Sequence, residues 1–305
     1  MRIAVTGGTG FVGQALVSAL LARGDEVWII SRKTAQDRTG QERLHYATWQ
    51  QLEQNPALLE GTDCIVNLAG ESINQRWSAK AKARILNSRT DAAARIAKLV
   101  GALRQKPATV VNASGISIYG TSDTKTFDES SPAHINDFLG SVVEQWEESA
   151  RTIPAERLVL VRVSLVLGNR GGAFPLMSLP YRLFGGGRVG SGRQWMPWIH
   201  IEDMTRVLLF CIDNRDIAGP VNACAPQPVT TDQFGRAIGK AMRRPHWFPV
   251  PAFLLRTLLG EMSSLLLQGQ RVLPAKLQQG GFDFRYPTIE SAMENLVGKS
   301  SKPSV

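Results

Sequence analysis

The sequence predicts an α/β fold, a doubly wound parallel sheet with a smaller region formed mainly by the C-terminal half of the chain. Three observations predict it. Short apolar segments alternate with segments of helical spacing up to about residue 165, the pattern becomes irregular after that point, and segments such as 64–66 (CIV) are apolar throughout. Strands that alternate with helices predict a parallel sheet with right-handed crossovers. Strands that are apolar throughout are expected where helices cover both faces.

Each expected element follows from local spacing. The expected strands are 2–6, 26–30, 44–49, 63–68, 109–113 and 158–163. Apolar residues at helical spacing predict helices that start at Phe11, that cover 84–104 and 138–151, and that recur as shorter helices at 203–213 and 232–242. We therefore expect one domain at 1–165, a smaller region at 166–297 with some segments returning to the sheet, and a frayed polar tail at 298–305.

The composition is that of a globular protein with a sizeable core, since 43% of the 305 residues are hydrophobic and 20% are charged. The formal charge is +9, but Lys and Arg are scattered without interleaved aromatics, which favours small anionic ligands over nucleic acid. The three cysteines lack the spacing of a disulfide framework or a zinc site, so we expect no metal and a cytoplasmic protein. The longest apolar run, 253–267, is too short and too interrupted to span a membrane.

A glycine-rich turn follows the first expected strand. Residues 3–13 read IAVTGGTGFVG and give a G-x-x-G-x-x-G spacing before an expected helix. In this setting the glycines allow the tight turn, the approach of a pyrophosphate to the backbone, and close packing of helix on sheet. The helix N-terminus adds free N–H groups and a partial positive charge. The spacing predicts a dinucleotide-binding Rossmann unit, with a structural turn as the alternative; the pyrophosphate contacts expected are Gly7, Thr9, Gly10, Phe11, Val12 and Gly13.

The end of the second expected strand favours one dinucleotide over the other. NAD-binding proteins usually carry an acid there, which accepts hydrogen bonds from the ribose 2′-OH. This chain carries Ser31, Arg32 and Lys33 instead. Arg32 can make charge-assisted hydrogen bonds to a 2′-phosphate, each worth about 1.5–3 kcal/mol. The predicted cofactor is therefore NADP(H); the alternative is a solvated pair of charges after a strand.

TGGTGFVG, ISRK and NLAG (67–70) together resemble the extended short-chain dehydrogenase/reductase superfamily, which includes the nucleoside-diphosphate-sugar epimerases and dehydratases. LAGESI, RW (76–77), NSR (87–89), GSGRQWMPWIHIED (190–203) and KLQQGGFDFRYPTIESAM resemble an atypical subgroup, described as sugar-nucleotide epimerases of unestablished substrate. The resemblance covers nearly the whole chain. It implies further cofactor contacts from Leu68, Ala69, Gly70 and Val163.

The chain departs from the superfamily where the usual proton chemistry lies. In the superfamily a Ser or Thr after the fifth strand and a Y-x-x-x-K on the next helix act together, with the Tyr as acid/base and the Lys lowering its pKa. Here Gly115 stands at the serine position, Phe138 at the tyrosine position and Val142 at the lysine position. Y-x-x-x-K occurs nowhere in the sequence. Phenylalanine has no proton to exchange, so the usual mechanism is excluded.

Three residues near the strand ends are candidates for the missing proton chemistry, and each has a structural alternative. Glu71 follows the fourth strand, where ligands bind in this architecture, and could act as a general base or cap the next helix. Ser114 could bind a substrate carbonyl or hydroxyl, or its own backbone. Tyr119 could be a displaced acid or could pack beneath its loop.

Two arginines are candidates for recognising an anionic substrate group. Arg89 lies on the long helix and could reach such a group, or it could pair with Asp91 or Glu71 as part of the structure. Arg193 lies in the stretch that resembles the substrate-binding part of the superfamily. Its guanidinium presents a fork of donors that matches phosphate oxygens.

The same stretch contains further candidates with an aromatic or imidazole ring. Trp195 and Trp198 offer flat faces on which a sugar or a base could stack, with core packing as the alternative. His200 could titrate near neutral pH. The alternative for His200 is a satisfied partner of Glu202 or Asp203, and this alternative is favoured over catalysis.

These observations favour an NADP(H)-dependent oxidoreductase or epimerase that acts on a small polar substrate, with nucleotide sugars among the candidates. A hydride would move between the nicotinamide and a carbinol carbon while a residue other than tyrosine handles the proton. The alternative is a catalytically silent NADP(H)-binding protein, a redox sensor or scaffold. No nucleic-acid or membrane partner is expected, and the chain is expected to be a monomer or a homodimer.

Overall fold

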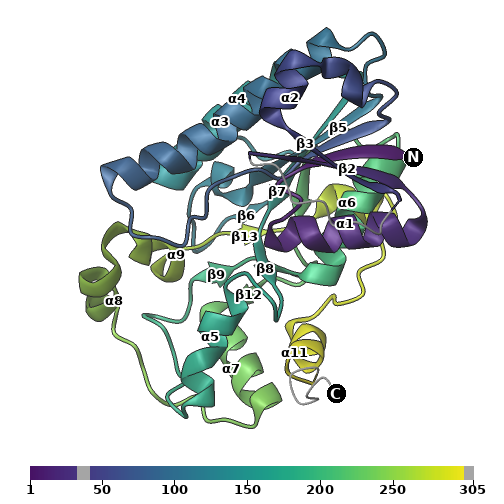
Figure 1. Cartoon of the computed structure of the whole chain (residues 1–305). Helices are drawn as coiled ribbons and strands as arrows, with labels where there is room; N and C mark the ends of the chain where they lie inside the picture. The colour runs from purple at the N-terminus through teal and green to yellow at the C-terminus, as the bar shows by residue number, and fades with distance from the viewer. Residues whose placement is uncertain (33–41, 299–305) are drawn as a thin grey trace.

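A seven-stranded parallel sheet organises the chain (Figure 1). The computed structural model describes residues 1–32 and 42–298, so Lys33 and residues 299–305 lie outside the described residues. The doubly wound parallel sheet expected from the sequence is confirmed. Across the sheet, the strands are β11 (Gly219–Ala223), β7 (Arg157–Val163), β5 (Thr109–Gly115), β4 (Cys64–Asn67), β1 (Arg2–Thr6), β2 (Glu26–Ser31) and β3 (Leu44–Thr48).

The order of the strands creates a switch point beside β1. This strand pairs in parallel with both β2 and β4. The chain therefore winds from β1 to β3 in one direction, and then from β4 through β5 and β7 to β11 in the other. In open α/β sheets, ligands bind at the carboxyl ends of the strands around such a reversal. The carboxyl ends of β1, β4 and β5 are therefore where a functional site is expected.

Helices cover both faces of the sheet. Leu16, Leu20 and Leu208 belong to the apolar cluster on the face covered by α1 and α6. Ile96 and Trp146 belong to the cluster on the opposite face, which α2, α3 and α4 cover. Figure 1 shows these two helical layers on either side of the sheet. The covering helices are α1 (Phe11–Arg23), α6 (Ile201–Asp213), α2 (Trp49–Gln54), α3 (Ala79–Ala102) and α4 (Phe138–Arg151).

Local capping explains where three of these helices start or stop. Gly24 ends α1 in a left-handed conformation, with φ 90°. The Ser78 side chain accepts a hydrogen bond from the Ala81 N–H, and α3 therefore begins five residues before the expected 84. The Asp137 side chain accepts from the Gly140 N–H and starts α4 at the expected residue.

A smaller region lies beneath the carboxyl edge of the sheet in Figure 1 and has an apolar core of its own. Phe174, Phe234 and Leu296 from three different helices belong to this core. Small sheets join β8 to β10 in parallel and β9 to β12 in antiparallel. The elements are α5 (Phe174–Arg182), α7 (Thr231–Met242), α11 (Ile289–Gly298), β8 (Leu165–Leu167), β10 (Trp198–His200), β9 (Trp195–Met196) and β12 (Val229–Thr230).

Segments from the C-terminal half also return to the sheet, because β11 forms its edge and α6 packs on α1. Among residues 1–32 and 42–298, no helix is long and apolar enough to cross a membrane. The remaining elements are η1 (Pro56–Leu59), η2 (Ile116–Tyr119), β6 (Thr126–Phe127), α8 (Ala252–Leu259), η3 (Gly260–Ser263), α9 (Ser264–Leu267), β13 (Arg271–Val272) and α10 (Ala275–Gln279).

Candidate functional site

The glycine loop joins β1 to α1 at the switch point, and its geometry requires glycine. Gly7 adopts a left-handed φ of +68°, and a Cβ there would lie 2.6 Å from the Leu68 carbonyl oxygen. A Cβ on Gly13 would lie 2.1 Å from the Gly7 carbonyl oxygen, so only glycine lets α1 pack this closely on the loop. The Gly10 N–H donates to the Gly7 carbonyl oxygen at 2.9 Å and closes the turn. Thr9 lies exposed in this turn.

The first turn of α1 presents hydrogen-bond donors without acceptors. Gly10 precedes the helix and makes no side-chain cap. The N–H groups of Phe11, Val12 and Gly13 have no acceptor in the part of the chain that the structure describes. Both Phe11 and Val12 are half-buried, and Gly10 is exposed. A row of free donors at the positive end of a helix fits an anionic phosphate group.

Ser31 and Arg32 follow the same edge of the sheet. Because Thr6 pairs in register with Ile30, the residues after both strands lie beside one another. Ser31 ends β2, and Arg32 comes next with an exposed side chain. Neither residue is acidic, so no carboxylate at this point would repel a phosphate. The third residue expected here, Lys33, lies outside the described residues.

The segment after β4 forms the next part of the edge. The Leu68 N–H donates to the Thr6 carbonyl oxygen at 3.1 Å and holds the segment against β1. Ala69 and Gly70 follow, and the half-buried Glu71 donates from its backbone N–H to Ser88 Oγ at 2.9 Å. The Glu71 carboxylate lies 3.7 Å from Arg84 Nε and accepts from Gln75 Nε2 at 3.4 Å. It therefore retains the capacity to accept another hydrogen bond.

The Arg89 guanidinium packs against this segment. Its Nη1 donates to the carbonyl oxygens of Glu71 at 3.1 Å and Ile85 at 2.9 Å. A Cβ on Gly70 would lie 3.1 Å from the Arg89 Cζ, and the Trp146 ring centroid lies 5.2 Å from the same atom. Burial lowers the pKa of Arg89 to about 10, against the opposing charge of Glu71. Arg89 thus holds the backbone after β4 through carbonyl oxygens, and the expected alternative of an ion pair with Asp91 or Glu71 is not seen among its contacts in the described chain.

A buried group of polar side chains occupies the carboxyl ends of β5 and β7. Ser114 is 3% exposed, and its Oγ donates to Glu147 Oε1 at 2.7 Å. Arg162 donates to both oxygens of that carboxylate, from Nε at 2.8 Å and from Nη2 at 3.0 Å. Burial raises the pKa of Glu147, but the hydrogen bonds and charge of Arg162 outweigh burial and leave this pKa below its ordinary value. The Ser114 hydroxyl therefore already donates its proton to a carboxylate of the chain.

Tyr119 belongs to the same group. Its side chain is 0% exposed, and its hydroxyl donates to Asn222 Oδ1 at 2.8 Å and accepts from Arg162 Nη1 at 2.8 Å. Burial raises the pKa of Tyr119 to about 12, although the charge of Arg162 acts against this. The structure therefore does not bring Tyr119 to the site as an acid. We call Ser114, Tyr119, Glu147, Arg162 and Asn222 the strand-end cluster.

Apolar packing fills the positions where the superfamily carries its proton-handling residues. Phe138 is half-buried, and the Trp77 ring packs edge-on against it at a centroid distance of 5.2 Å. Val142 is 2% exposed. A Cβ on Gly115 would lie 2.9 Å from Val143 Cγ2, so a serine there would require the neighbouring side chain to move. The missing functional groups are replaced by a packed interior.

Two of the four candidates after residue 190 lie at the surface. Arg193 is exposed and, together with Arg188, lines a hollow of about 540 Å³. Trp195 is half-buried, and its Nε1 donates to the Asp123 carbonyl oxygen at 3.0 Å. The Arg271 guanidinium lies 4.8 Å from the Trp195 ring centroid. One face of this indole is therefore already occupied by a cation.

Trp198 and His200 lie in the interior instead, because β10 is covered by the core of the C-terminal region. Trp198 is 1% exposed and belongs to that core. His200 is also 1% exposed, and its Nδ1 accepts from the Glu202 N–H at 3.1 Å at the start of α6. Its ring centroid lies 3.9 Å from that of Tyr286. The structure thus supports the structural alternatives for both residues and does not bring either to a ligand.

Comparison with known proteins identifies the family that shares this geometry. Residues 3–224 match the model of the NAD dependent epimerase/dehydratase family, and residues 250–296 match a domain of unknown function, DUF1731. The chain belongs to the NAD-dependent epimerase/dehydratase family. The family match covers the glycine loop, the segment after β4 and the whole strand-end cluster.

Relatives of this epimerase/dehydratase chain cover nearly its whole length. It is 43% identical over 300 residues to the "Epimerase family protein YfhF" of Bacillus subtilis (strain 168), covering 97% of this chain and 98% of the relative. It is 37% identical over 303 residues to the "Epimerase family protein SDR39U1" of Mus musculus, covering 97% and 100%. The crystal structure of human epimerase family protein SDR39U1 (isoform2) with NADPH has a TM-score of 0.91 at 36% identity, covering 98% and 99%. The expected atypical epimerase subgroup is confirmed.

Glu147 and Asn222 in this family member were not among the residues predicted from the sequence. Glu147 stands on the buried stripe of α4, next to Trp146 and four residues after Val143. An acid on an apolar stripe is the signal that could have identified it. Asn222 offered no such signal, because its place depends on the return of β11 to the sheet beside β7.

Proposed function

We propose that the chain is an NADP(H)-dependent oxidoreductase or epimerase that acts on a small polar substrate without a Y-x-x-x-K pair, with nucleotide sugars among the candidate substrates. The observation that carries the proposal is the row of acceptor-free N–H groups at the start of α1, beside the exposed Arg32. The human relative crystallised with NADPH supports the cofactor.

The residues at the switch point fit a dinucleotide phosphate. The free N–H groups of α1 would bind the pyrophosphate, and Gly10 leaves room for it, since a Cβ there would meet only the Gly7 carbonyl oxygen, at 3.2 Å. Arg32 would bind the 2′-phosphate of the adenosine ribose. Bound there, the nicotinamide would supply a hydride donor or acceptor, while the protein supplies orientation and electrostatics.

Glu71 is the candidate that best suits the proton transfer. Its carboxylate is half-buried at the carboxyl end of β4, and its side-chain partners lie at 3.4 Å and 3.7 Å. By contrast, the Ser114 hydroxyl donates to Glu147 and the Tyr119 side chain is fully buried. In this proposal Glu71 accepts the proton of the substrate hydroxyl as the hydride leaves the carbinol carbon, and returns it in the reverse direction.

Arg193 suits recognition of an anionic group on the substrate. It lines the hollow near Arg188, and two guanidinium groups on one surface favour a phosphate or carboxylate. Asp232 also lines this hollow, but it pairs with Arg236 at 2.7 Å and with His246 at 3.0 Å. The carboxylate is thereby occupied, while Arg193 has no side-chain ion pair in the described part of the chain.

Calorimetric titration of the purified protein with NADPH and NADH tests the cofactor. We expect tighter binding of NADPH, and we expect Arg32→Glu to weaken it by about 10- to 150-fold, the equivalent of about 1.5–3 kcal/mol. Arg43→Glu is the matched control. Arg43 is also exposed, but it precedes β3 and so lies at the amino ends of the strands, whereas Arg32 lies at their carboxyl ends. Equal affinity of the unmodified protein for the two cofactors would contradict the proposal.

Turnover is tested by mixing the protein with NADP+ or NADPH and a panel of carbonyl compounds, sugars and nucleotide sugars. Absorbance of the reduced cofactor reports redox turnover, and product analysis reports epimerisation. For a substrate that reacts, Glu71→Gln should lower kcat by about 10²- to 10⁴-fold and leave NADPH affinity unchanged. Glu53→Gln, at an exposed position on α2, is the control. An unchanged kcat in Glu71→Gln would remove Glu71 from the proposed mechanism.

A second candidate is a catalytically silent NADP(H)-binding protein, a redox sensor or scaffold. The observation that favours it is the apolar packing at the tyrosine, lysine and serine positions, where Val142 is 2% exposed and a Cβ on Gly115 would lie 2.9 Å from Val143 Cγ2. Tight NADPH binding without turnover of any compound in the panel would favour this candidate over the enzyme.

A further inference from the structure

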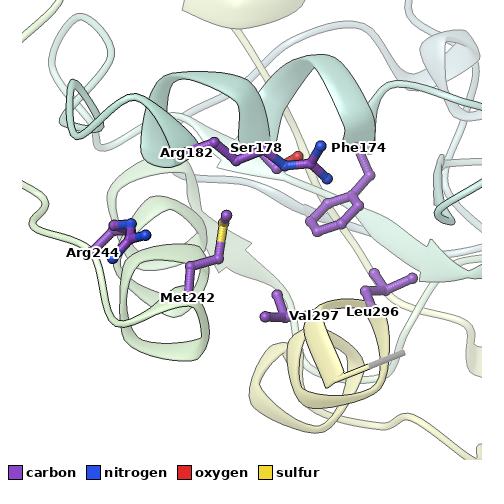
Figure 2. Close-up of a pocket in the computed structure, with 7 residues that line it drawn as sticks. All are labelled: Phe174, Ser178, Arg182, Met242, Arg244, Leu296 and Val297. Carbon is purple, nitrogen blue, oxygen red and sulfur yellow. The ribbon is translucent and has the colours of Figure 1, made fainter. Parts of the chain in front are cut away.

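A pocket of about 250 Å³ lies in the C-terminal region, between α5, the end of α7 and the end of α11 (Figure 2). Much of its wall is apolar and consists of Phe174, Met242, Leu296 and Val297. Figure 2 shows Leu296 and Val297 on α11 across the pocket from the Phe174 ring and the Met242 side chain. None of these residues contributes to the proposed cofactor or substrate contacts, so the pocket is a separate feature of the molecule.

Two arginines bring uncompensated charge to this apolar pocket. Arg182 is exposed, and its guanidinium makes no hydrogen bond and no ion pair with residues 1–32 and 42–298. The Arg244 guanidinium lies 4.1 Å from the Phe184 ring centroid and forms no ion pair with the described chain. Its Nε is buried without a hydrogen-bond partner. A buried donor without a hydrogen-bond partner is unfavourable, so the Arg244 Nε favours a ligand that brings an acceptor into the pocket.

The arrangement of the polar groups indicates where an anion would lie. Figure 2 shows Arg182 extending along α5 toward the Phe174 ring, with Arg244 on the far side of Met242. The remaining polar side chain of the pocket, Ser178, donates its hydroxyl to the Pro175 carbonyl oxygen at 3.1 Å. The arginines are therefore the free polar donors of the pocket, and apolar side chains lie between them and opposite them.

We propose that this pocket binds a small anionic amphiphile, with its carboxylate attracted by the positive charge of Arg182 and Arg244 and its hydrocarbon part against the apolar side chains at the end of α11. Guanidinium groups match carboxylate and phosphate oxygens, and the apolar walls exclude a fully polar ligand. The volume lies just below the range of about 300–1,000 Å³ typical of pockets for drug-sized molecules, so the ligand is a single ring or a medium-length chain. Carboxylate and phosphate monoester heads share this chemistry.

Calorimetric titration of the full-length protein with octanoate tests the proposal, with octyl phosphate to compare the head groups and octan-1-ol as the neutral ligand of equal length. We expect saturable octanoate binding at least about 10-fold tighter than octanol binding. Arg182→Gln and Arg244→Gln should each weaken octanoate binding by about 10-fold or more. Arg215→Gln is the control, because Arg215 is exposed on the loop between α6 and β11. Stronger binding of octyl phosphate would assign the phosphate head.

A second variant keeps both arginines and tests the pocket itself. Val297→Asp places a carboxylate of the chain beside them and should abolish octanoate binding. Octanoate should also raise the melting temperature of the unmodified protein and not that of this variant. The measurements are made with and without saturating NADPH, since the pocket is expected to bind octanoate in both cases. Absence of saturable octanoate binding, or equal losses in Arg182→Gln and Arg215→Gln, would overturn the proposal.

Discussion

Two polar sites lie at the carboxyl edge of the same sheet, and they differ in what they leave unsatisfied. At the glycine loop, three consecutive N–H groups of α1, those of residues 11–13, have no acceptor in the described chain. In the strand-end cluster, both oxygens of Glu147 accept hydrogen bonds, Arg162 donates from all three nitrogens, and Asn222 donates to the Leu273 carbonyl oxygen at 3.0 Å.

The difference separates a site that can bind a ligand from one that completes the fold. The first N–H groups of a helix have no backbone acceptor, and those of α1 lie at the glycine loop, where a phosphate group can accept from them. The strand-end cluster lies beside the positions where the superfamily would carry proton chemistry, and its groups satisfy one another. In this member of the family, binding capacity is retained at β1 and the neighbouring strand ends are used for structure.

The largest expected effect comes from breaking the buried ion pair of the strand-end cluster. Arg162→Met leaves the Glu147 carboxylate buried without its main partner, and breaking a buried pair in this way costs about 3–5 kcal/mol of unfolding free energy. Arg151→Met is the matched control, because Arg151 pairs with the same carboxylate at 2.9 Å through a side chain that is 54% exposed. That loss should stay below about 1 kcal/mol. Urea denaturation measures both, and similar small losses would show that the strand-end cluster is not held by the buried pair.

The next largest effect comes from a substitution that moves the glycine loop away from α1. In Gly13→Ala the new Cβ would lie 2.1 Å from the Gly7 carbonyl oxygen, so α1 must move away from the loop. We expect NADPH affinity to fall at least about 100-fold, or about 2.7 kcal/mol, because the free N–H groups lose their common orientation. Gly101→Ala is the control, since a Cβ there meets nothing within 4 Å. Calorimetry that found equal NADPH affinity in the two variants would contradict the assignment of the loop.

The sequence predicted the glycine loop better than the strand-end cluster. The loop is built from neighbouring residues, whereas the cluster joins residues that are far apart along the chain. The glycine loop spans residues 7–13, and its spacing alone predicts a turn between a strand and a helix. The strand-end cluster joins Ser114 to Glu147 over 33 positions and Tyr119 to Asn222 over 103 positions. Those contacts depend on the register of β5, β7 and β11, which no local pattern contains.

The same contrast holds for the secondary structure. Helix α4 begins at Phe138 because Asp137 caps it locally, and its bounds were predicted from spacing and match the structure. Helix α5 was missed because it carries Pro180 in its interior, where proline normally argues against a helix, whereas Pro175 in its first turn is compatible with one. Trp198 was a substrate candidate because the sequence does not distinguish an aromatic residue in a core from one at a surface. Only the tertiary packing shows which of the two it is.

Lowering the pH should distinguish the Glu147 carboxylate of the strand-end cluster from an ordinary surface carboxylate. The folded-state pKa of Glu147 lies below the ordinary value of 4.5, so its ionised form contributes stability that is present above pH 4.5 and is lost as the pH falls through the folded-state pKa. Glu147→Gln should therefore be less stable than the unmodified protein at pH 7 and should lose less further stability below pH 4.5. Urea denaturation across this range measures the slopes, and parallel slopes would mean that the carboxylate is not held by Arg162.

The smallest expected effect concerns the exposed contact that links α3 to the C-terminal region. Lys82 Nζ lies 2.5 Å from Glu261 Oε2, with the two side chains 30% and 50% exposed, and 4.9 Å from the Phe138 ring centroid. Exposed pairs contribute about 0.2–1 kcal/mol, because water screens them and two long side chains must be ordered.

A double-mutant cycle with Lys82→Gln and Glu261→Gln measures that coupling, which should fall further at 1 M salt, where the Debye length is only about 3 Å. A coupling above about 2 kcal/mol that persists in salt would place this contact with the buried strand-end cluster rather than with surface pairs. A small, salt-sensitive value would place the contact between α3 and η3 with ordinary surface ion pairs.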